Sequence, residues 1–341
     1  MVKTIKKPGI FLLMIFMLVA FLAGCQPNNI PTSGTQVTDQ LGRQVSIPKE
    51  VERIASPYSI ANSLVIALGA KDKIVGIEMN GEKNIIYQKS DPKLTQLPGI
   101  GSGRTLNLEE CVKLKPDLVI LPSRMQEEVE KLEQQNIAVI AIEPEDLDSL
   151  QETIKLVGKA IGAEEKANEL ISFYQEKINM VKDITKNISS SPGVYLAGKE
   201  PLATCTKEMY QHFLINLAGG TNVAQEIEQG FWANVSQEQV VKWQPDVIFI
   251  VQYAGYGPEE LLQDVKWQAV PAVQNKNVYL FPSKIEPWDY PTPATVLGIL
   301  WATHTLHPEL YDRSSLENDV LSFYEKFYGF KLTAEEFGLW N

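Results

Sequence analysis

The chain has few of the side chains that most often carry catalysis or bind metals. Its 341 residues include three histidines and three cysteines, and none of them follows an HExxH, HxH or paired-cysteine pattern with zinc-ligand spacing. A Walker loop, a G-x-G-x-x-G fingerprint and a G-x-S-x-G elbow are also missing. We therefore expect no catalytic residue, no cofactor and no metal site, and we favour a binding protein over an enzyme.

Positive charge is also in short supply. Lys and Arg number 31 against 42 Asp and Glu, which gives a formal net charge of −11. Without a basic stripe to neutralise phosphates, nucleic acid is not an expected partner. The hydrophobic content of 44%, with 22 Gly and 20 Pro, excludes a disordered or collagen-like chain and indicates one large or two medium globular domains.

Only one long apolar run is present, and it lies at the amino terminus. Three lysines precede it, and residues 10–25 then carry no charge. This pattern predicts a signal peptide at residues 1–24, followed by a polar tether at residues 25–36. The sequence LAGC at residues 22–25 resembles the lipobox of bacterial lipoproteins, which implies lipidation of Cys25 and a location outside the cell membrane, held there by the lipid. The alternative is an ordinary signal peptide with a chance cysteine.

A segment of the chain is repeated 129 residues later. Residues 106–120 align with residues 235–249, and Glu, Val, Lys, Pro and Asp coincide in the two copies. Each copy predicts a short helix, a Pro-Asp turn and a buried strand. Asn107 and Ser236 are the expected N-caps, each followed three residues later by Glu or Gln as in a capping box.

Strands and helices alternate on both sides of this repeat. The apolar, β-branched strands favour parallel sheets covered by helices. We therefore predict an α/β protein with two Rossmann-like lobes, residues 37–162 and residues 188–341, and a ligand cleft between them. The aromatic C-terminal stretch, residues 315–340, is expected to pack on the second lobe.

A helical segment separates the predicted lobes. Ser149 is expected to open a helix that Gly158 and Gly162 interrupt. Apolar residues then recur close to every 3.6 positions, which predicts one long linking helix over residues 163–187. A stiff helix of this kind allows small rocking of the lobes against each other.

Four segments in this order resemble the substrate-binding lipoproteins of ABC importers for iron-siderophore, haem or cobalamin. They are residues 37–43 (VTDQLGR), residues 53–57 (RIASP), the two Glu-to-Pro-Asp repeats, and residues 293–302. The resemblance covers about residues 37–330. It implies a monomeric solute-binding protein that captures an iron chelate and delivers it to permease and ATPase subunits. Molybdate or tungstate and cobalamin are the alternative ligands of the same transporter type, and an extracytoplasmic enzyme is the alternative outside it.

The resemblance also implies a role for one acidic residue in each repeat. Glu109 and Glu238 match the residues that dock arginine pockets on the permease. An arginine pocket recognises carboxylate geometry well. The alternative is that each Glu only favours the dipole of its own helix.

Ligand-binding residues are expected in the loops that leave the carboxyl ends of the strands. Aromatic side chains there would pack against a macrocycle or catecholate, and Arg or Lys would pair with an anionic ligand. For each of them the alternative is an ordinary surface or packing role. The candidates are Tyr58, Arg104, Arg124, Lys199, Tyr256 and Trp288.

Overall fold

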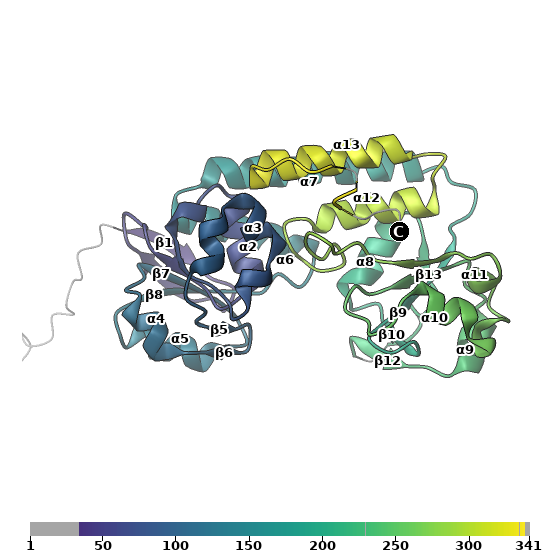
Figure 1. The fold of residues 1–341 in the computed structure, drawn as a ribbon, viewed down its shortest axis with the longest axis horizontal. Helices are drawn as coiled ribbons and strands as arrows, with labels where there is room; N and C mark the ends of the chain where they lie inside the picture. Colours follow the sequence, from purple (N-terminus) through teal and green to yellow (C-terminus); the bar gives the residue numbers. More distant parts are fainter. Residues whose placement is uncertain (1–33, 229, 334, 338–341) are drawn as a thin grey trace, which may run out of the picture. The chain divides into compact units, whose positions relative to one another are not determined.

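The computed structural model describes residues 34–228, 230–333 and 335–337. The predicted signal peptide, the lipidation residue Cys25 and most of the predicted tether lie outside these residues. The described chain has two α/β lobes with a long helix running between them, as predicted (Figure 1). No helix in this part of the chain is long and apolar enough to cross a bilayer.

The first lobe is built on a sheet whose described strands are all parallel. In spatial order they are β4 (Ile74–Gly76), β3 (Ile54–Ala55), β7 (Leu118–Pro122) and β8 (Ala138–Ile142). The antiparallel hairpin β1 (Thr35–Thr38) and β2 (Gln44–Ile47) adjoins this sheet through β8. The helices are α2 (Ser59–Ala67), α3 (Ile85–Ser90), α4 (Leu108–Lys113) and α5 (Gln126–Glu133), with short turns η1 (Lys71–Lys73), η2 (Gly81–Lys83) and η3 (Pro92–Gln96).

Strand β7 explains why this sheet has helices on both faces. All five of its residues are buried. Leu118 and Ile120 join the cluster that contains α2, whereas Val119 and Leu121 join the cluster of α4 and α5. Because successive side chains of a strand point to opposite faces, a continuous apolar run requires cover on both sides.

The second lobe repeats the plan with a larger, mixed sheet. In spatial order its strands are β12 (Trp232–Asn234), β10 (Ala203–Cys205), β9 (Gly193–Ala197), β13 (Val247–Ile250) and β14 (Val278–Leu280), while β11 (Thr221–Asn222) also pairs with β9. Strands β9, β11, β13 and β14 are parallel, and β10 and β12 are antiparallel. The helices are α8 (Tyr210–Leu217), α9 (Gln237–Trp243), α10 (Pro258–Gln263) and α11 (Pro271–Gln274), with the turn η4 (Val265–Trp267).

The sequence repeat forms the same structure twice. Asn107 caps α4 and Ser236 caps α9, each accepting a backbone N–H at 3.2 Å, as predicted. The repeated aspartates fasten each motif to the neighbouring strand. Asp117 accepts the backbone N–H of Arg53 at 2.9 Å, and Asp246 accepts that of Gly193 at 2.8 Å. The repeat therefore sets the position of β7 beside β3 and of β13 beside β9.

The helices between the lobes differ in detail from the prediction. Helix α6 (Leu147–Ile161) starts at Asp146, which accepts the N–H of Ser149, so Ser149 lies inside the first turn instead of opening the helix. Gly158 does not interrupt α6. A Cβ atom at this position would lie 2.5 Å from the Cβ of Ala167, so the glycine permits close packing of α6 on α7 (Glu164–Thr185).

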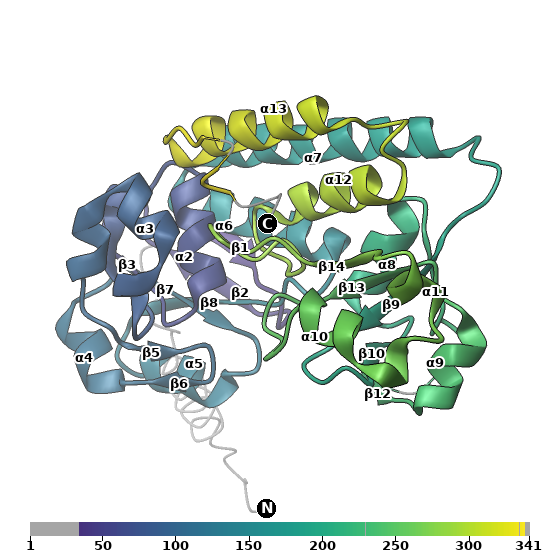
Figure 2. The ribbon, with the colours of Figure 1, turned by 45° about the vertical axis from the view of Figure 1, so that its right-hand side comes forward.

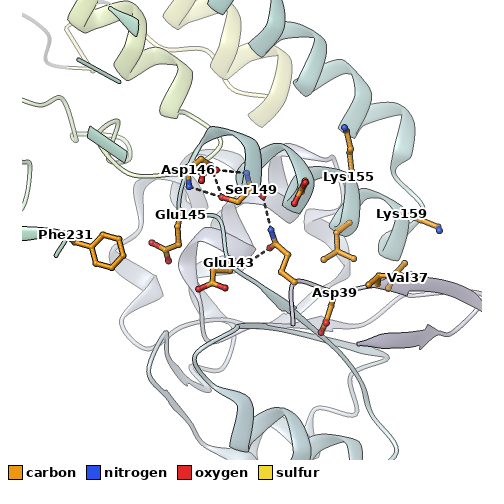
Figure 3. A pocket seen from close by; sticks show the side chains of 13 residues that line it. Val37, Asp39, Glu143, Glu145, Asp146, Ser149, Lys155, Lys159 and Phe231 are labelled. Carbon is orange, nitrogen blue, oxygen red and sulfur yellow. Dashed lines mark hydrogen bonds between the residues drawn. The ribbon is translucent and has the colours of Figure 1, made fainter. Parts of the chain in front are cut away.

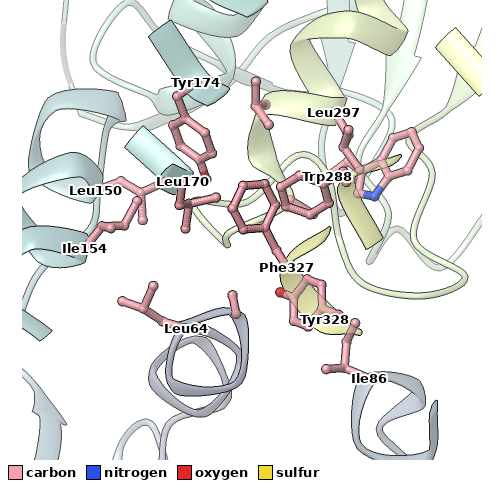
Figure 4. Close-up of a cluster of buried hydrophobic side chains, with 14 of the residues drawn as sticks. Leu64, Ile86, Leu150, Ile154, Leu170, Tyr174, Trp288, Leu297, Phe327 and Tyr328 are labelled. Carbon is pink, nitrogen blue, oxygen red and sulfur yellow. The ribbon is translucent and has the colours of Figure 1, made fainter. Parts of the chain in front are cut away.

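The C-terminal segment was predicted to pack on the second lobe, and this is wrong in part. Helix α13 (Arg313–Phe323) packs on α12 (Thr295–Leu306), but the following π-helical turn η5 (Tyr324–Tyr328) contacts α2 of the first lobe. Phe327 and Tyr328 are 4% and 2% exposed and lie close to Leu64 and Ile86 (Figure 4). The segment therefore joins both lobes through one aromatic cluster.

Candidate functional site

A cavity of about 910 Å³ lies between the lobes. The first lobe lines it with residues that follow β3, β4 and β7, and the second lobe with residues that follow β13 and β14. In an α/β protein these are the carboxyl ends of parallel strands, the usual place for a ligand. Three of the six candidates from the sequence line this cavity together: Tyr58, Arg104 and Arg124.

Tyr58 and Arg124 are held against each other. The Cζ atom of Arg124 lies 5.2 Å from the centre of the Tyr58 ring, a cation–π contact. Arg124 Nε also donates to the carbonyl oxygen of Gly103 at 2.8 Å, and a Cβ atom at Gly103 would come within 2.9 Å of the guanidinium. The aromatic ring, the carbonyl group and the missing side chain together fix the Arg124 guanidinium at the cavity wall.

Arg104 reaches the cavity from a different element. It lies at the tip of the hairpin formed by β5 (Gly101–Ser102) and β6 (Thr105–Leu106), and it is exposed. On the second lobe the same cavity is lined by Tyr290, which is 37% exposed and packs edge-on against Tyr253 with ring centres 5.7 Å apart. Cations from one lobe and an aromatic surface from the other therefore border the same space.

Two buried carboxyl groups in the second lobe were missed by the sequence analysis. Glu286, which lines the cavity, is 5% exposed, and its Oε2 accepts the hydroxyl of Tyr328 at 3.1 Å. Asp289 is 0% exposed, and its Oδ2 accepts the N–H of Gln252 at 3.2 Å. Glu286 Oε1 and Asp289 Oδ1 have no hydrogen-bond partner among the described residues.

Burial disfavours the charged form of both groups. It raises the pKa of Glu286 to about 8 and that of Asp289 to about 7. The available sequence signal was the apolar and proline-rich surroundings of these acids, the segment IEPWDYP at residues 285–291. That pattern fits a buried loop as well as an exposed one, because sequence does not show solvent access.

A third acid in the cavity, also missed, is fully engaged by its own lobe. Glu78 Oε2 accepts hydrogen bonds from Asn62 Nδ2 at 2.8 Å and from the Tyr87 hydroxyl at 2.7 Å. Its bonds tie β4 to α2 and α3, so we assign it a structural role at the cavity rim.

The other three candidates lie elsewhere. Trp288 is 1% exposed and its Nε1 donates to the Tyr324 hydroxyl at 3.0 Å, so it is a core residue with almost no surface for a ligand. Lys199 and Tyr256 line a separate pocket of about 350 Å³, where the Tyr256 hydroxyl donates to Gly198 at 2.8 Å. Trp288 was misjudged because a large aromatic residue in a cleft loop fits packing inward as well as facing outward.

A second depression, of about 840 Å³, adjoins the cavity. Glu145 lines both spaces. Around it lie the exposed Glu143 and the first turn of α6, and Phe231 of the second lobe, which is 61% exposed, lies opposite (Figure 3). This region is acidic, whereas the cavity itself is lined by more cations than ionised acids.

The two docking candidates occupy matching positions. Glu109 and Glu238 are exposed and stand in the first turns of α4 and α9. In both views of the molecule α4 and α9 lie on the side away from α7, one on each lobe (Figures 1 and 2). The arrangement therefore presents two carboxylates on one side of the molecule, which a two-subunit partner can contact at once.

Comparison with known proteins identifies the type of molecule. Residues 54–285 match the family described as periplasmic binding protein. The molybdate-binding protein MolA of Haemophilus influenzae is 29% identical over 86% of this chain and 90% of its own. The ABC transporter substrate-binding lipoprotein YvrC of Bacillus subtilis is 24% identical over 90% and 99%. A periplasmic solute-binding protein from Veillonella parvula superposes with a TM-score of 0.79 and 30% identity, covering 89% of this chain and 95% of its own.

Proposed function

Because this chain belongs to the periplasmic binding protein family, it is the extracytoplasmic solute-binding component of an ABC transporter, and we propose that its solute is an anionic metal chelate. Members of this family are substrate-binding proteins, not enzymes. The observation that carries the proposal is the combination of charge and size in the cavity between the lobes.

The charge of the cavity is opposite to that of the chain. Four cationic side chains line it: Lys83, Arg104, Arg124 and Lys284. Against them stand Glu78, Glu145 and Glu286, of which Glu286 is neutral at pH 7 because burial raises its pKa to about 8. Cations thus exceed ionised acids here, although the whole chain has a net charge of −11. An anion is the ligand that this local excess favours.

The size of the cavity favours a chelate over a bare ion. A volume of about 910 Å³ lies within the range of ~300–1,000 Å³ typical of pockets that enclose drug-sized ligands. Tyr58 and Tyr290 offer ring surfaces from opposite lobes, on which the planar groups of a catecholate chelate would stack. A tetrahedral oxyanion would use only a corner of this space.

Molybdate is the second candidate, and a specific finding favours it. MolA, with 29% identity over most of both chains, is a molybdate-binding protein. A small oxyanion needs only a few donors, which one arginine and some backbone N–H groups would supply. Both candidates share the requirement for an anion, and they differ in size.

Isothermal calorimetry on the purified mature chain tests the proposal. We expect saturable binding of a ferric catecholate chelate and weak or no binding of sulfate. Stronger binding of molybdate than of the chelate would replace the first candidate by the second. Failure of every ferric chelate, molybdate and tungstate to bind would contradict an anionic solute altogether.

Two further proposals concern how the protein reaches its transporter. We propose that Cys25 carries the lipid that anchors the chain, and that Glu109 and Glu238 contact the permease. A Cys25→Ala variant tests the first, because it should appear in the soluble fraction or the medium while the wild-type chain stays with the membrane. Membrane association of both proteins would contradict the anchor.

A further inference from the structure

One helix begins at the wall of the cavity without a cap. Helix α2 starts at Ser59, and its N-cap residue Tyr58 makes no side-chain capping bond. The backbone N–H groups of Ser59 and Ile60 have no acceptor among the described residues, and the first turn contains no acidic residue. Ser59, Ile60 and Ser63 all line the cavity. The helix therefore presents unpaired donors to the space in which we expect the solute.

Such a helix start attracts negative charge. The first N–H groups of a helix have no partner within it, and the aligned peptide dipoles place about half a positive charge at this end. Arg124 adds a full charge at the same place, since its guanidinium packs on the ring of Tyr58, the residue that precedes the helix. Arg104 lines the same cavity from the neighbouring hairpin.

An independent observation on the second lobe points to the same space. Glu286 lines the cavity, is 5% exposed and leaves Oε1 without a partner in the described chain. Buried polar atoms are nearly always paired, so an unpaired one at a cavity indicates a group that is still to be bound. Glu286 is also tied to the α2 side, because its partner Tyr328 belongs to η5, which packs against α2.

We propose that the amino terminus of α2 is the subsite for the anionic oxygens of the solute. The N–H groups of Ser59 and Ile60 and the guanidinium groups of Arg104 and Arg124 hold the anion from the first lobe, and the carboxyl group of Glu286 donates a hydrogen bond to it from the second. This inference rests on the proposed function and deepens it. The shared chemistry is a group with several anionic oxygens, either a free oxyanion or part of a chelate.

Glu286 suits the role of a donor because it is neutral. Burial raises its pKa to about 8, so at pH 7 it keeps its proton and does not repel an anion. The groups that face it are the hydroxyls of Tyr324 and Tyr328 from η5, Tyr174 from α7 and Thr292 from its own loop, none of them a cation. The carboxyl group therefore has no ion-pair partner that would hold it ionised.

The first experiment removes a single backbone donor. Proline is well tolerated at the first position of a helix, and Tyr58 has the extended backbone (φ −119°, ψ 112°) that a following proline requires. Ser59→Pro therefore deletes the N–H and the hydroxyl without breaking α2, whereas Ser59→Ala deletes only the hydroxyl. The probes are molybdate, inorganic phosphate and the ferric complex of 2,3-dihydroxybenzoate. We expect about tenfold weaker binding or more for Ser59→Pro, and less than half of that loss for Ser59→Ala.

A second variant separates binding from folding. Ser59→Asp places a negative charge where it favours the helix dipole, so the thermal unfolding temperature should stay the same or rise. The same charge repels an anionic ligand, so binding should fall by about a hundredfold or more. A purely structural role for Ser59 cannot give these opposite effects together.

The third readout is a pH profile. Binding to the wild-type protein should weaken between pH 7 and pH 9 as Glu286 loses its proton, while Glu286→Gln, which keeps a neutral donor, should bind equally at both pH values. Loss of affinity for molybdate or phosphate in these variants would identify a free oxyanion as the source, and loss only for the ferric complex would identify a chelate.

Two results overturn the subsite in distinguishable ways. If the wild-type protein binds a probe and Ser59→Pro and Ser59→Asp bind it equally well, the subsite is wrong and the proposed function stands. If the wild-type protein binds none of the three probes, the anionic solute and the subsite fall together.

Discussion

The two lobes share one motif and use it differently at the cavity. Both place a capped helix, a Pro-Asp turn and a buried strand in the same order, and both carry an exposed Glu in that helix. At the cavity, however, the first lobe contributes guanidinium groups and an open helix start, whereas the second contributes Tyr290 and a buried, neutral carboxyl group. The repeated frame therefore serves the outer contact surface, and the loops after the strands divide the chemistry of binding between the lobes.

The symmetry of the outer surface gives the largest expected effect. In the double variant Glu109→Ala with Glu238→Ala, solute uptake by cells should be lost, because neither permease subunit finds its carboxylate. Solute affinity of the purified variant should equal that of the wild type. Glu110→Ala, one residue further along α4, is the matched control and should transport normally. Normal uptake by the double variant would show that the matched glutamates serve only their own helices.

The asymmetry of the cavity gives the next effect. Arg124→Gln should weaken solute binding by roughly tenfold to a hundredfold, because a charged hydrogen bond contributes about 1.5–3 kcal/mol. Gly103→Ala should act in the same direction, since the added Cβ would lie 2.9 Å from the guanidinium. Lys199→Gln, in the separate pocket, is the control and should bind as the wild type does in calorimetry. An equal loss for Lys199→Gln would mean that the wrong pocket has been assigned.

The buried acids predict a pH dependence that belongs to the second lobe. The folded state keeps the proton of Glu286 up to a pKa of about 8, whereas the ordinary value is 4.5, and Asp289 behaves likewise between 3.8 and about 7. The folded state thus binds more protons in this window, so the free energy of unfolding should fall as pH rises from about 5 to 8, by on the order of a few kcal/mol. Urea unfolding at several pH values checks this.

The control for that prediction is a variant that cannot ionise. Glu286→Gln with Asp289→Asn should flatten the dependence of the unfolding free energy on pH. A wild-type protein that becomes more stable over the same window would contradict the neutral state of both acids.

The smallest effect concerns the helices that the lobes share. Gly158→Ala should destabilise the protein by about 1–3 kcal/mol, because its Cβ would lie 2.5 Å from that of Ala167 and α6 would have to move off α7. Gly162→Ala, at a left-handed position with open space around it, is the comparison for backbone strain alone. Thermal unfolding of both variants measures the difference, and equal stability of Gly158→Ala and the wild type would show that this helix contact is loose.

The sequence predicted what depends on local pattern. The caps at Asn107 and Ser236, the parallel strands and the two-lobed architecture follow from periodicity and turn chemistry, which neighbouring residues determine. Tyr58, Arg104 and Arg124 were found because ligands gather at the carboxyl ends of parallel strands.

What the sequence could not provide depends on burial and long-range packing. Glu286 and Asp289 are ordinary acids by type, and only the fold removes them from water. Trp288 was placed in the cleft although the Tyr324 hydroxyl holds it in the core. The C-terminal turn reaches the first lobe because Phe327 and Tyr328 find apolar partners there, far away in the chain.

That C-terminal turn has a consequence for how the solute leaves. A hydrophobic cluster continues from α2 through α7 and η5 into the second lobe, so a wide swing of the lobes would expose aromatic rings to water. Exchange with the medium must then depend on small displacements at the mouth of the cavity. Prising the halves further apart requires outside work, which makes the ATP-driven transporter, more than thermal motion, the agent that empties the carrier.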